Sequence, residues 1–228
     1  MRATLHWYTQ AGTLTADNRD ACARIEQAHA SLYLIADGSS SHPRSGELAT
    51  ALLAELVQGF GHLPASELSP AQLAKGLLQL IDSSHQNLRD AYPQAACSYL
   101  MLCLLADAAF SIHEGDCCLG LAEQGGQIRW LSRAHCVANW QGSLTHAELA
   151  QTESRHRLTR CFSARRASCP EVNHWQPRAN QHWLLATDGF WAGLSDLQQQ
   201  IFLRDGSLPT PPTGDDISCL SVITSLTG

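Results

Sequence analysis

Several aspartates in this chain stand where a buried strand would end. Asp37 and Asp188 each follow an apolar run and precede a glycine, in the stretches LYLIADG and HWLLATDG. The other aspartates at comparable boundaries are Asp20, Asp116, Asp215 and Asp216. A single Asp-Gly pair is typical of a turn. Because the pattern recurs along most of the chain, it predicts that these carboxylates converge on one rim of a layered fold.

Carboxylates that converge in this way need compensating positive charge. Several like charges in a partly buried site are tolerated only when cations neutralise them. Hard oxygen ligands with room for water suit Mg²⁺ or Mn²⁺. Two such ions about 3.5–4 Å apart would activate a water and bind a phosphoryl oxygen for in-line attack. The aspartates therefore predict a two-metal hydrolase.

The hydrophobic pattern predicts the elements that position these residues. Leucine spacing predicts a helix over 46–60, and Ser69 followed by Pro70 predicts the start of a second helix that runs to about 88. Short apolar runs predict strands at 32–36, 99–106, 110–113, 119–122, 127–131, 182–187 and 217–224. We also expect a hairpin at 125–126, helices over 145–158 and 195–202, and a rigid loop at 209–212. This order predicts an α+β layered domain and not a repeating βαβ sheet.

The composition narrows the class of protein. A chain of 228 residues, 44% of them hydrophobic, fits a single domain over 1–228. The net charge of -6 and the lack of a basic block argue against binding to nucleic acid or to an anionic membrane. The first residues lack a signal-peptide pattern, and the longest apolar run, 99–106, is too short to span a bilayer, so we expect a cytoplasmic protein. Nine cysteines without a CxxC pair indicate neither a disulfide framework nor a structural zinc site.

Six motifs, in order, resemble those of PP2C-type metal-dependent protein serine/threonine phosphatases, particularly bacterial ones. They are ADGSSSH with SGELAT (36–50), HEGDC (113–117), IRWLSRAH (128–135), RLTRCF (157–162), LLATDGFW (184–191) and GDDIS (214–218). The resemblance spans roughly residues 12 to 224. It implies a four-layer α-β-β-α sandwich of two antiparallel sheets flanked by helices, and hydrolysis of phosphoserine and phosphothreonine in partner proteins.

The resemblance also implies roles for the aspartates. Asp37 would bridge two Mn²⁺ or Mg²⁺ ions, the Gly38 carbonyl would be a further ligand, and Asp188 and Asp215 would complete the shell of the first ion. Asp20 would hold metal-bound water directly or in the second shell. Asp116 matches the position of a weaker third ion. The implied nucleophile is metal-bound hydroxide, without a phosphoenzyme.

The chain departs from the family at the residue that clamps the substrate phosphate. An arginine is usual five residues before the position of Asp20, and here that residue is Thr15. Arg19 and Arg44 are candidates to bind the phosphate instead, and Arg44 is also a candidate for a catalytic role. His42 is a candidate to donate a proton to the leaving seryl oxygen, although a structural role for this histidine fits equally well.

Three functions therefore compete. The first is an active phosphatase acting on phosphorylated proteins, in opposition to a kinase. The second is a catalytically silent PP2C-like module that binds phosphoproteins or regulates a complex, which the missing arginine favours and the retained aspartates disfavour. The third is a hydrolase of small phosphoesters. Substrate choice would be tuned in 145–152, where the family carries a flap, and the sequence leaves the oligomeric state open.

Overall fold

Two antiparallel sheets make up the centre of the computed structural model, which describes residues 2–178, 180–209 and 214–225. The first sheet has the order β1 (Arg2–Gln10), β11 (Ile217–Ser225), β10 (His182–Ala186), β6 (Cys118–Ala122) and β7 (Ile128–Trp130). The second has the order β2 (Asp20–Glu26), β3 (Ala30–Gly38), β4 (Ala96–Leu105), β5 (Ala109–Glu114) and β9 (Glu171–Trp175), and β8 (Phe162–Ser163) pairs with β4. Most of the loop predicted at 209–212 lies outside the described residues.

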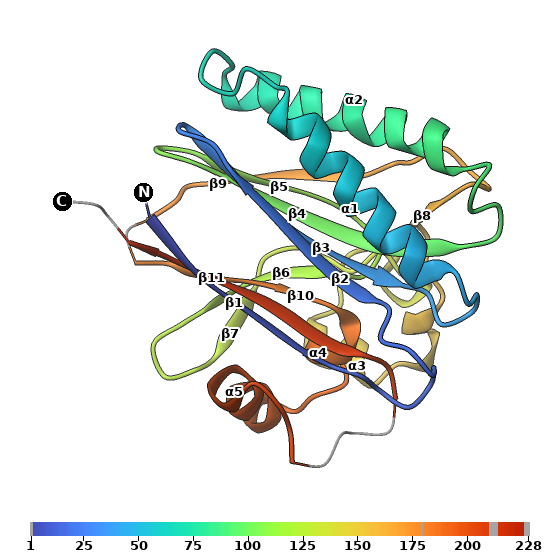
Figure 1. Cartoon of the computed structure of the whole chain (residues 1–228). Coiled ribbons are helices and arrows are strands. Elements are labelled where there is room, and N and C mark those ends of the chain that lie inside the picture. Colours follow the sequence, from blue (N-terminus) through green and yellow to red (C-terminus); the bar gives the residue numbers. More distant parts are fainter. Residues whose placement is uncertain (1, 179, 210–213, 226–228) are drawn as a thin grey trace.

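Helices cover the outer faces of both sheets (Figure 1). The long helices α1 (Ser45–Gly61) and α2 (Pro70–Leu88) lie on the second sheet. The short helices α3 (His146–Ala150), α4 (Asp188–Trp191) and α5 (Asp196–Asp205) lie on the side of the first sheet. The 3₁₀ turns η1 (Val137–Asn139) and η2 (Glu153–His156) precede and follow α3 along the chain. The order of layers is α-β-β-α, which confirms the predicted fold class.

Three hydrophobic cores fill the spaces between the four layers. Successive side chains of a strand point to opposite faces of its sheet, so the central strands are buried on both sides. In β3 and β4 one set of alternate residues packs under α1 and α2, and the other set packs between the sheets. The first set is Leu32, Leu34, Ala36, Tyr99, Met101 and Cys103. The second is Tyr33, Ile35, Leu100, Leu102 and Leu104.

The same alternation explains why the aspartates meet. Asp37 continues the set of β3 residues that faces the space between the sheets. Asp20 lies directly opposite Asp37 in the β2–β3 pair, and therefore faces the same side. Asp188 follows the end of β10, and Asp215 precedes the start of β11, which is antiparallel to it. These four residues consequently lie at one end of the inter-sheet layer.

The predicted elements agree with the structure except in one segment. The strands from apolar runs, both long helices, the helix capped by Ser195 and the hairpin at Gly125-Gly126 are confirmed. The helix predicted over 145–158 is wrong, because α3 ends at Ala150 and η2 starts at Glu153. Thr152 breaks the helix: its backbone is extended, and its hydroxyl donates to the Glu148 carbonyl at 2.9 Å.

No helix in the described part of the chain is long and apolar enough to cross a membrane.

Candidate metal centre

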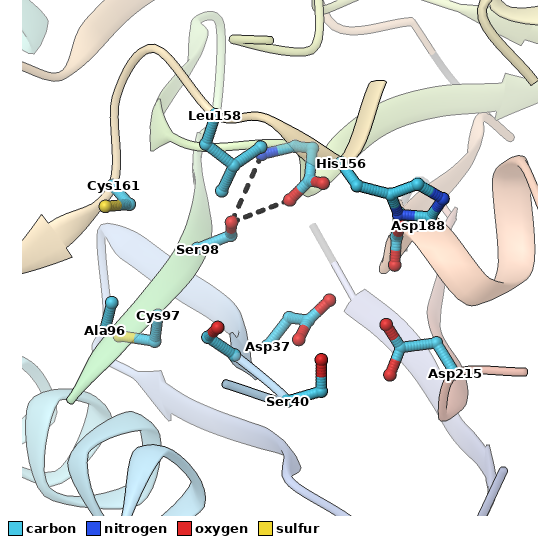
Figure 2. A pocket seen from close by; sticks show the side chains of 12 residues that line it. Asp37, Ser40, Ala96, Cys97, Ser98, His156, Leu158, Cys161, Asp188 and Asp215 are labelled. Atoms are coloured by element: carbon cyan, nitrogen blue, oxygen red, sulfur yellow. Dashed lines mark hydrogen bonds between the residues drawn. The ribbon is translucent and has the colours of Figure 1, made fainter. Parts of the chain in front are cut away.

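A cavity of about 250 Å³ opens at the end of the inter-sheet layer (Figure 2). Figure 2 shows the carboxylates of Asp37, Asp188 and Asp215 turned toward a common space. Asp116 also lines this cavity. The remaining lining residues are Ser39, Ser40, Ala96, Cys97, Ser98, His156, Leu158 and Cys161. The structure thus brings together four of the six residues predicted as metal ligands.

The other two predicted ligands, Asp20 and Gly38, do not line the cavity but are neighbours of Asp37 in the sheet and in the chain. Asp20 is opposite Asp37 in the sheet, and its Oδ2 accepts a hydrogen bond from the Thr187 hydroxyl at 3.1 Å. Gly38 is buried at the end of β3, where the chain passes close to the start of α1. A Cβ atom at Gly38 would lie 2.6 Å from the carbonyl carbon of Ser45. Only glycine therefore allows the backbone next to Asp37 to pack against this helix.

Asp116 is held in the cavity by its neighbours. Its Oδ1 accepts a hydrogen bond from the Ser98 hydroxyl at 2.7 Å, and its carbonyl accepts one from the Trp191 indole at 2.8 Å. Gly115 has φ of 110°, in the left-handed region, and any side chain there would collide with Ser98. The turn that presents Asp116 therefore requires glycine, which explains the Gly-Asp pair in the sequence.

Asp188 is partnered by an arginine that the sequence analysis did not single out. Arg155, in η2, donates from Nη1 to Asp188 Oδ2 at 2.6 Å, and both side chains are largely buried. The other carboxylate oxygen, Oδ1, is buried and has no hydrogen-bond partner in the described structure. A buried carboxylate oxygen without a donor is costly unless a cation or water satisfies it. This oxygen is therefore available to a metal ion.

The two adjacent aspartates before β11 have different surroundings. Asp216 accepts hydrogen bonds from the backbone N–H groups of Gly12 and Arg19, both at 2.8 Å. It therefore ties the loop between β1 and β2 to the start of β11. Asp215 instead lines the cavity, where Figure 2 shows its carboxylate pointing inward. This division agrees with Asp215 as the predicted metal ligand.

Burial and mutual repulsion disfavour the ionised form of the cavity aspartates. Burial raises the pKa of Asp37 well above its usual value, and the charges of Asp20, Asp188, Asp116 and Asp215 raise it further. Burial likewise raises the pKa of Asp20 well above normal, that of Asp116 to about 7 and that of Asp215 to about 6. Bound cations remove this penalty because they neutralise the charges. The donor set therefore fits divalent metal ions with oxygen ligands.

These pKa shifts predict that Asp116→Asn stabilises the metal-free protein at high pH. The folded chain holds the Asp116 proton up to about pH 7, whereas an unfolded chain releases it near 3.8, so folding loses stability as the pH rises between these values. The buried histidines His135 and His146, with pKa values lowered to about 4, give the opposite slope below about pH 6.5. The difference between wild type and variant isolates the aspartate.

The measurement is thermal unfolding in EDTA from pH 5 to 8. We expect the melting temperature of Asp116→Asn to exceed that of wild type by a few degrees at pH 8, with the gain shrinking toward pH 5. Saturating Mn²⁺ should reverse the order, because both proteins then bind the two main ions but only wild type gains the stabilisation from the third ion at Asp116. A variant that is less stable than wild type at every pH in EDTA would contradict the assigned repulsion.

Arg19 holds the loop after β3. Its Nη1 donates to the carbonyls of Ser39, Ser40 and His42 at 3.2, 3.2 and 3.0 Å, and its Nε pairs with Asp17 at 3.1 Å. Its side chain is only 9% exposed. These contacts stiffen the loop that carries the three serines Ser39, Ser40 and Ser41. The predicted phosphate contact of Arg19 stays a prediction, because its guanidinium is engaged with the loop.

Arg44 and His42 lie outside the metal cavity. The Arg44 guanidinium pairs with Glu47 at 2.9 Å, donates to the Ala91 carbonyl at 2.8 Å and lies 4.6 Å from the centre of the Tyr92 ring. His42 accepts from the Arg44 N–H through Nδ1 at 3.2 Å and lines a neighbouring groove. Their catalytic and phosphate-binding roles remain predictions. From these positions the two side chains would have to move toward the cavity, or the substrate would have to be large enough to reach them.

A second group of potential ligands consists of His113, His135 and Glu171. The two imidazole rings are stacked, with centroids 4.4 Å apart and planes within 10° of parallel. A ring nitrogen binds a metal in the plane of its ring, and two stacked parallel planes do not meet at one ion. The outer nitrogens already bond the Arg133 carbonyl and Glu171, at 2.9 and 3.2 Å. We interpret this group as a hydrogen-bonded packing cluster.

Comparison with known proteins identifies the family. The sequence profile of Protein phosphatase 2C matches residues 14–208. No curated protein matches at the sequence level. Among solved structures, the S. agalactiae serine/threonine phosphatase is 17% identical, with a TM-score of 0.81 and coverage of 98% of this chain and 100% of that one. Staphylococcus aureus Stp1 is 15% identical, with a TM-score of 0.82 and coverage of 100% and 96%.

A further structure is that of the catalytic domain of PstP with two manganese ions, at 16% identity, a TM-score of 0.72, and coverage of 98% of this chain and 99% of that one. At these identities the structures establish the fold alone. The profile covers most of the chain and agrees with the order of the motifs and with the aspartate cavity. The chain therefore belongs to the protein phosphatase 2C family of protein serine/threonine phosphatases.

Proposed function

We propose that this chain is a catalytically active phosphatase that removes phosphate from phosphoserine and phosphothreonine in proteins at a centre of two divalent cations, Mn²⁺ or Mg²⁺. The residues proposed to hold the ions are Asp20, Asp37, Gly38, Asp188 and Asp215, with Asp116 as a ligand of a weaker third ion. When bound, the cations would supply a water of lowered pKa and neutralise the charge of the phosphate.

The observation that carries this proposal is the unbalanced charge of the cavity. Asp20, Asp37, Asp116, Asp188 and Asp215 act electrostatically on one another, yet among the described residues only Arg155 forms an ion pair with any of them. One guanidinium offsets one of five carboxylates. A silent binding module would gain stability by losing the others, so their retention supports metal-dependent chemistry.

The protein's own residues have two further tasks in this proposal. Arg19 fixes the loop that follows Asp37, and so keeps the carboxylate and the neighbouring backbone in place. Arg155 is proposed to contact the substrate phosphate in place of the arginine that the family has at the position of Thr15.

All nine cysteines are free thiols, which suits the reducing cytoplasm, and we propose that location.

The test is hydrolysis of p-nitrophenyl phosphate and of a phosphothreonine peptide by wild type and Asp188→Asn, with and without Mn²⁺. We expect Mn²⁺-dependent turnover of both substrates by wild type and none by the variant. Titration calorimetry with Mn²⁺ distinguishes the other outcomes. Bound metal without turnover would indicate a silent binding module, and turnover of p-nitrophenyl phosphate alone would indicate a hydrolase of small phosphoesters. No metal binding would overturn the proposed centre.

A further inference from the structure

Positive charge is concentrated in one segment beside the metal cavity. The chain has a net charge of -6, with 15 lysines and arginines in total. Five of these are in the twelve residues from 155 to 166, a segment with no aspartate or glutamate. They are Arg155, Arg157, Arg160, Arg165 and Arg166. The segment follows α3, runs along the cavity through His156, Leu158 and Cys161, and includes β8, which pairs with β4. An acidic protein thus carries a third of its lysine and arginine residues in one segment that passes along the metal cavity.

Most of these arginines have no acidic partner. Across residues 2–178, 180–209 and 214–225, Arg155 is the only one of the five with a carboxylate within 4.0 Å. Arg166 donates to the Thr159 carbonyl at 2.9 Å and to the Cys161 sulfur at 3.4 Å, which fixes its guanidinium beside the cavity wall. Arg165 is exposed and makes no side-chain hydrogen bond within the described structure. Arginines that only keep a surface soluble are usually interspersed with acids, which this segment lacks.

Arg165 and Arg166 line a groove that adjoins the metal cavity. The groove has a volume of about 520 Å³, and Ala96 and Cys161 line both spaces. Its other lining residues are Ser41, His42, Gln94, Ala95, Ser163, Arg165 and Arg166. The metal cavity is lined by four aspartates, whereas no acidic residue lines the groove. A substrate that spans both would meet a cation site at one end and fixed guanidiniums at the other.

We infer that this groove binds carboxylate side chains that flank the scissile phosphoresidue, so that the enzyme prefers phosphopeptides with aspartate or glutamate near the phosphate. The inference rests on the proposed phosphatase function and adds the substrate class. Arginine forks match carboxylates geometrically and provide charge-assisted hydrogen bonds. Seryl and amide groups in the groove can bind the peptide backbone. A peptide is the fitting partner because the groove extends from the place where its phosphate would lie.

The test compares two peptides with one central phosphothreonine, one flanked by glutamates and one by glutamines at the same positions. We expect wild type to have a kcat/KM about 3- to 10-fold higher for the glutamate peptide, the range for a few exposed ion pairs, and the ratio to shrink at high salt. R165Q should lower the ratio, and R165Q/R166Q should bring it close to one. The single variant guards against disturbance of the segment, since the Arg165 side chain is exposed and makes no hydrogen bond within the described residues.

Arg178→Gln is the matched control, because Arg178 is exposed and precedes β10, whose opposite end leads to Asp188. It should retain the wild-type ratio. Equal values for both peptides in wild type, or a preference that survives in R165Q/R166Q, would overturn the inference. Turnover of the glutamine peptide reports the phosphatase function separately. Fluorescence anisotropy with the same peptides gives affinities without turnover, so the groove is tested even if no substrate is hydrolysed.

Discussion

Asp37→Asn is expected to reduce Mn²⁺-dependent turnover of a phosphothreonine peptide by more than about 100-fold. Loss of a residue that only orients a metal ligand typically costs 10- to 100-fold in metal affinity or activity, and Asp37 is proposed to contact both ions directly. Asparagine has the same shape but offers one neutral oxygen in place of a carboxylate. The measurement is kcat/KM as a function of Mn²⁺ concentration, paired with metal affinity from calorimetry.

The fold should survive this substitution. In the metal-free protein, Asp37 is a half-buried acid repelled by four others, so replacing it removes repulsion and should not lower the melting temperature. Asp107→Asn is the matched control, because Asp107 is exposed in the turn between β4 and β5, at the far end of β4 from the cavity. It should leave turnover unchanged. Full activity of Asp37→Asn at low Mn²⁺ would remove Asp37 from the metal centre.

The sequence predicted the buried strands and one edge strand, β7, but missed the other three edge strands. β3, β4, β10 and β11 carry long apolar runs because both faces of each strand are covered. β1, β2 and β9 were not predicted, and none of them contains a fully buried residue. Each lies at the edge of its sheet, where a strand packs on one side and its polar residues obscure the pattern. Pairing with a neighbouring strand, and not local hydrophobicity, defines these three elements.

In the candidate site, too, some residues were predicted from local sequence and others were not. The aspartates were found because each follows a strand or turn with a recognisable local pattern, and glycine is required beside Asp37 and Asp116. The partners of the arginines depend on tertiary contacts instead. Nothing near Arg19 in the sequence indicates that it would bond three carbonyls about 20 residues away. The five arginines from 155 to 166 correct the expectation that the chain lacks a basic block, and only the folded path of this segment brings it to the cavity.

Arg155→Gln is expected to lower kcat/KM for the phosphothreonine peptide by about 10- to 100-fold, mainly through a higher KM. Arg155 acts on three of the cavity aspartates. It donates a hydrogen bond to Asp188, and its charge partly offsets the rise that burial causes in the pKa values of Asp116 and Asp215. Only its Nη1 has a hydrogen-bond partner in the described structure, so the other N–H groups are available to a phosphate. A charge-assisted contact of this kind contributes about 1.5–3 kcal/mol.

The result separates phosphate binding from simple neutralisation of Asp188. If Arg155 contacts the phosphate, Arg155→Gln raises KM, and Arg155→Lys recovers only part of the loss because lysine lacks the two-pronged fork. If Arg155 only competes with a cation for Asp188, Arg155→Gln binds Mn²⁺ more tightly, Arg155→Lys gains less because it keeps the positive charge, and KM stays at the wild-type value. Kinetics at saturating Mn²⁺, with metal affinity measured separately, distinguish these cases. An unchanged KM in Arg155→Gln would mean that Arg155 does not replace the phosphate-binding arginine that the family has at the position of Thr15. Arg19 and Arg44 would then be the remaining candidates for this role.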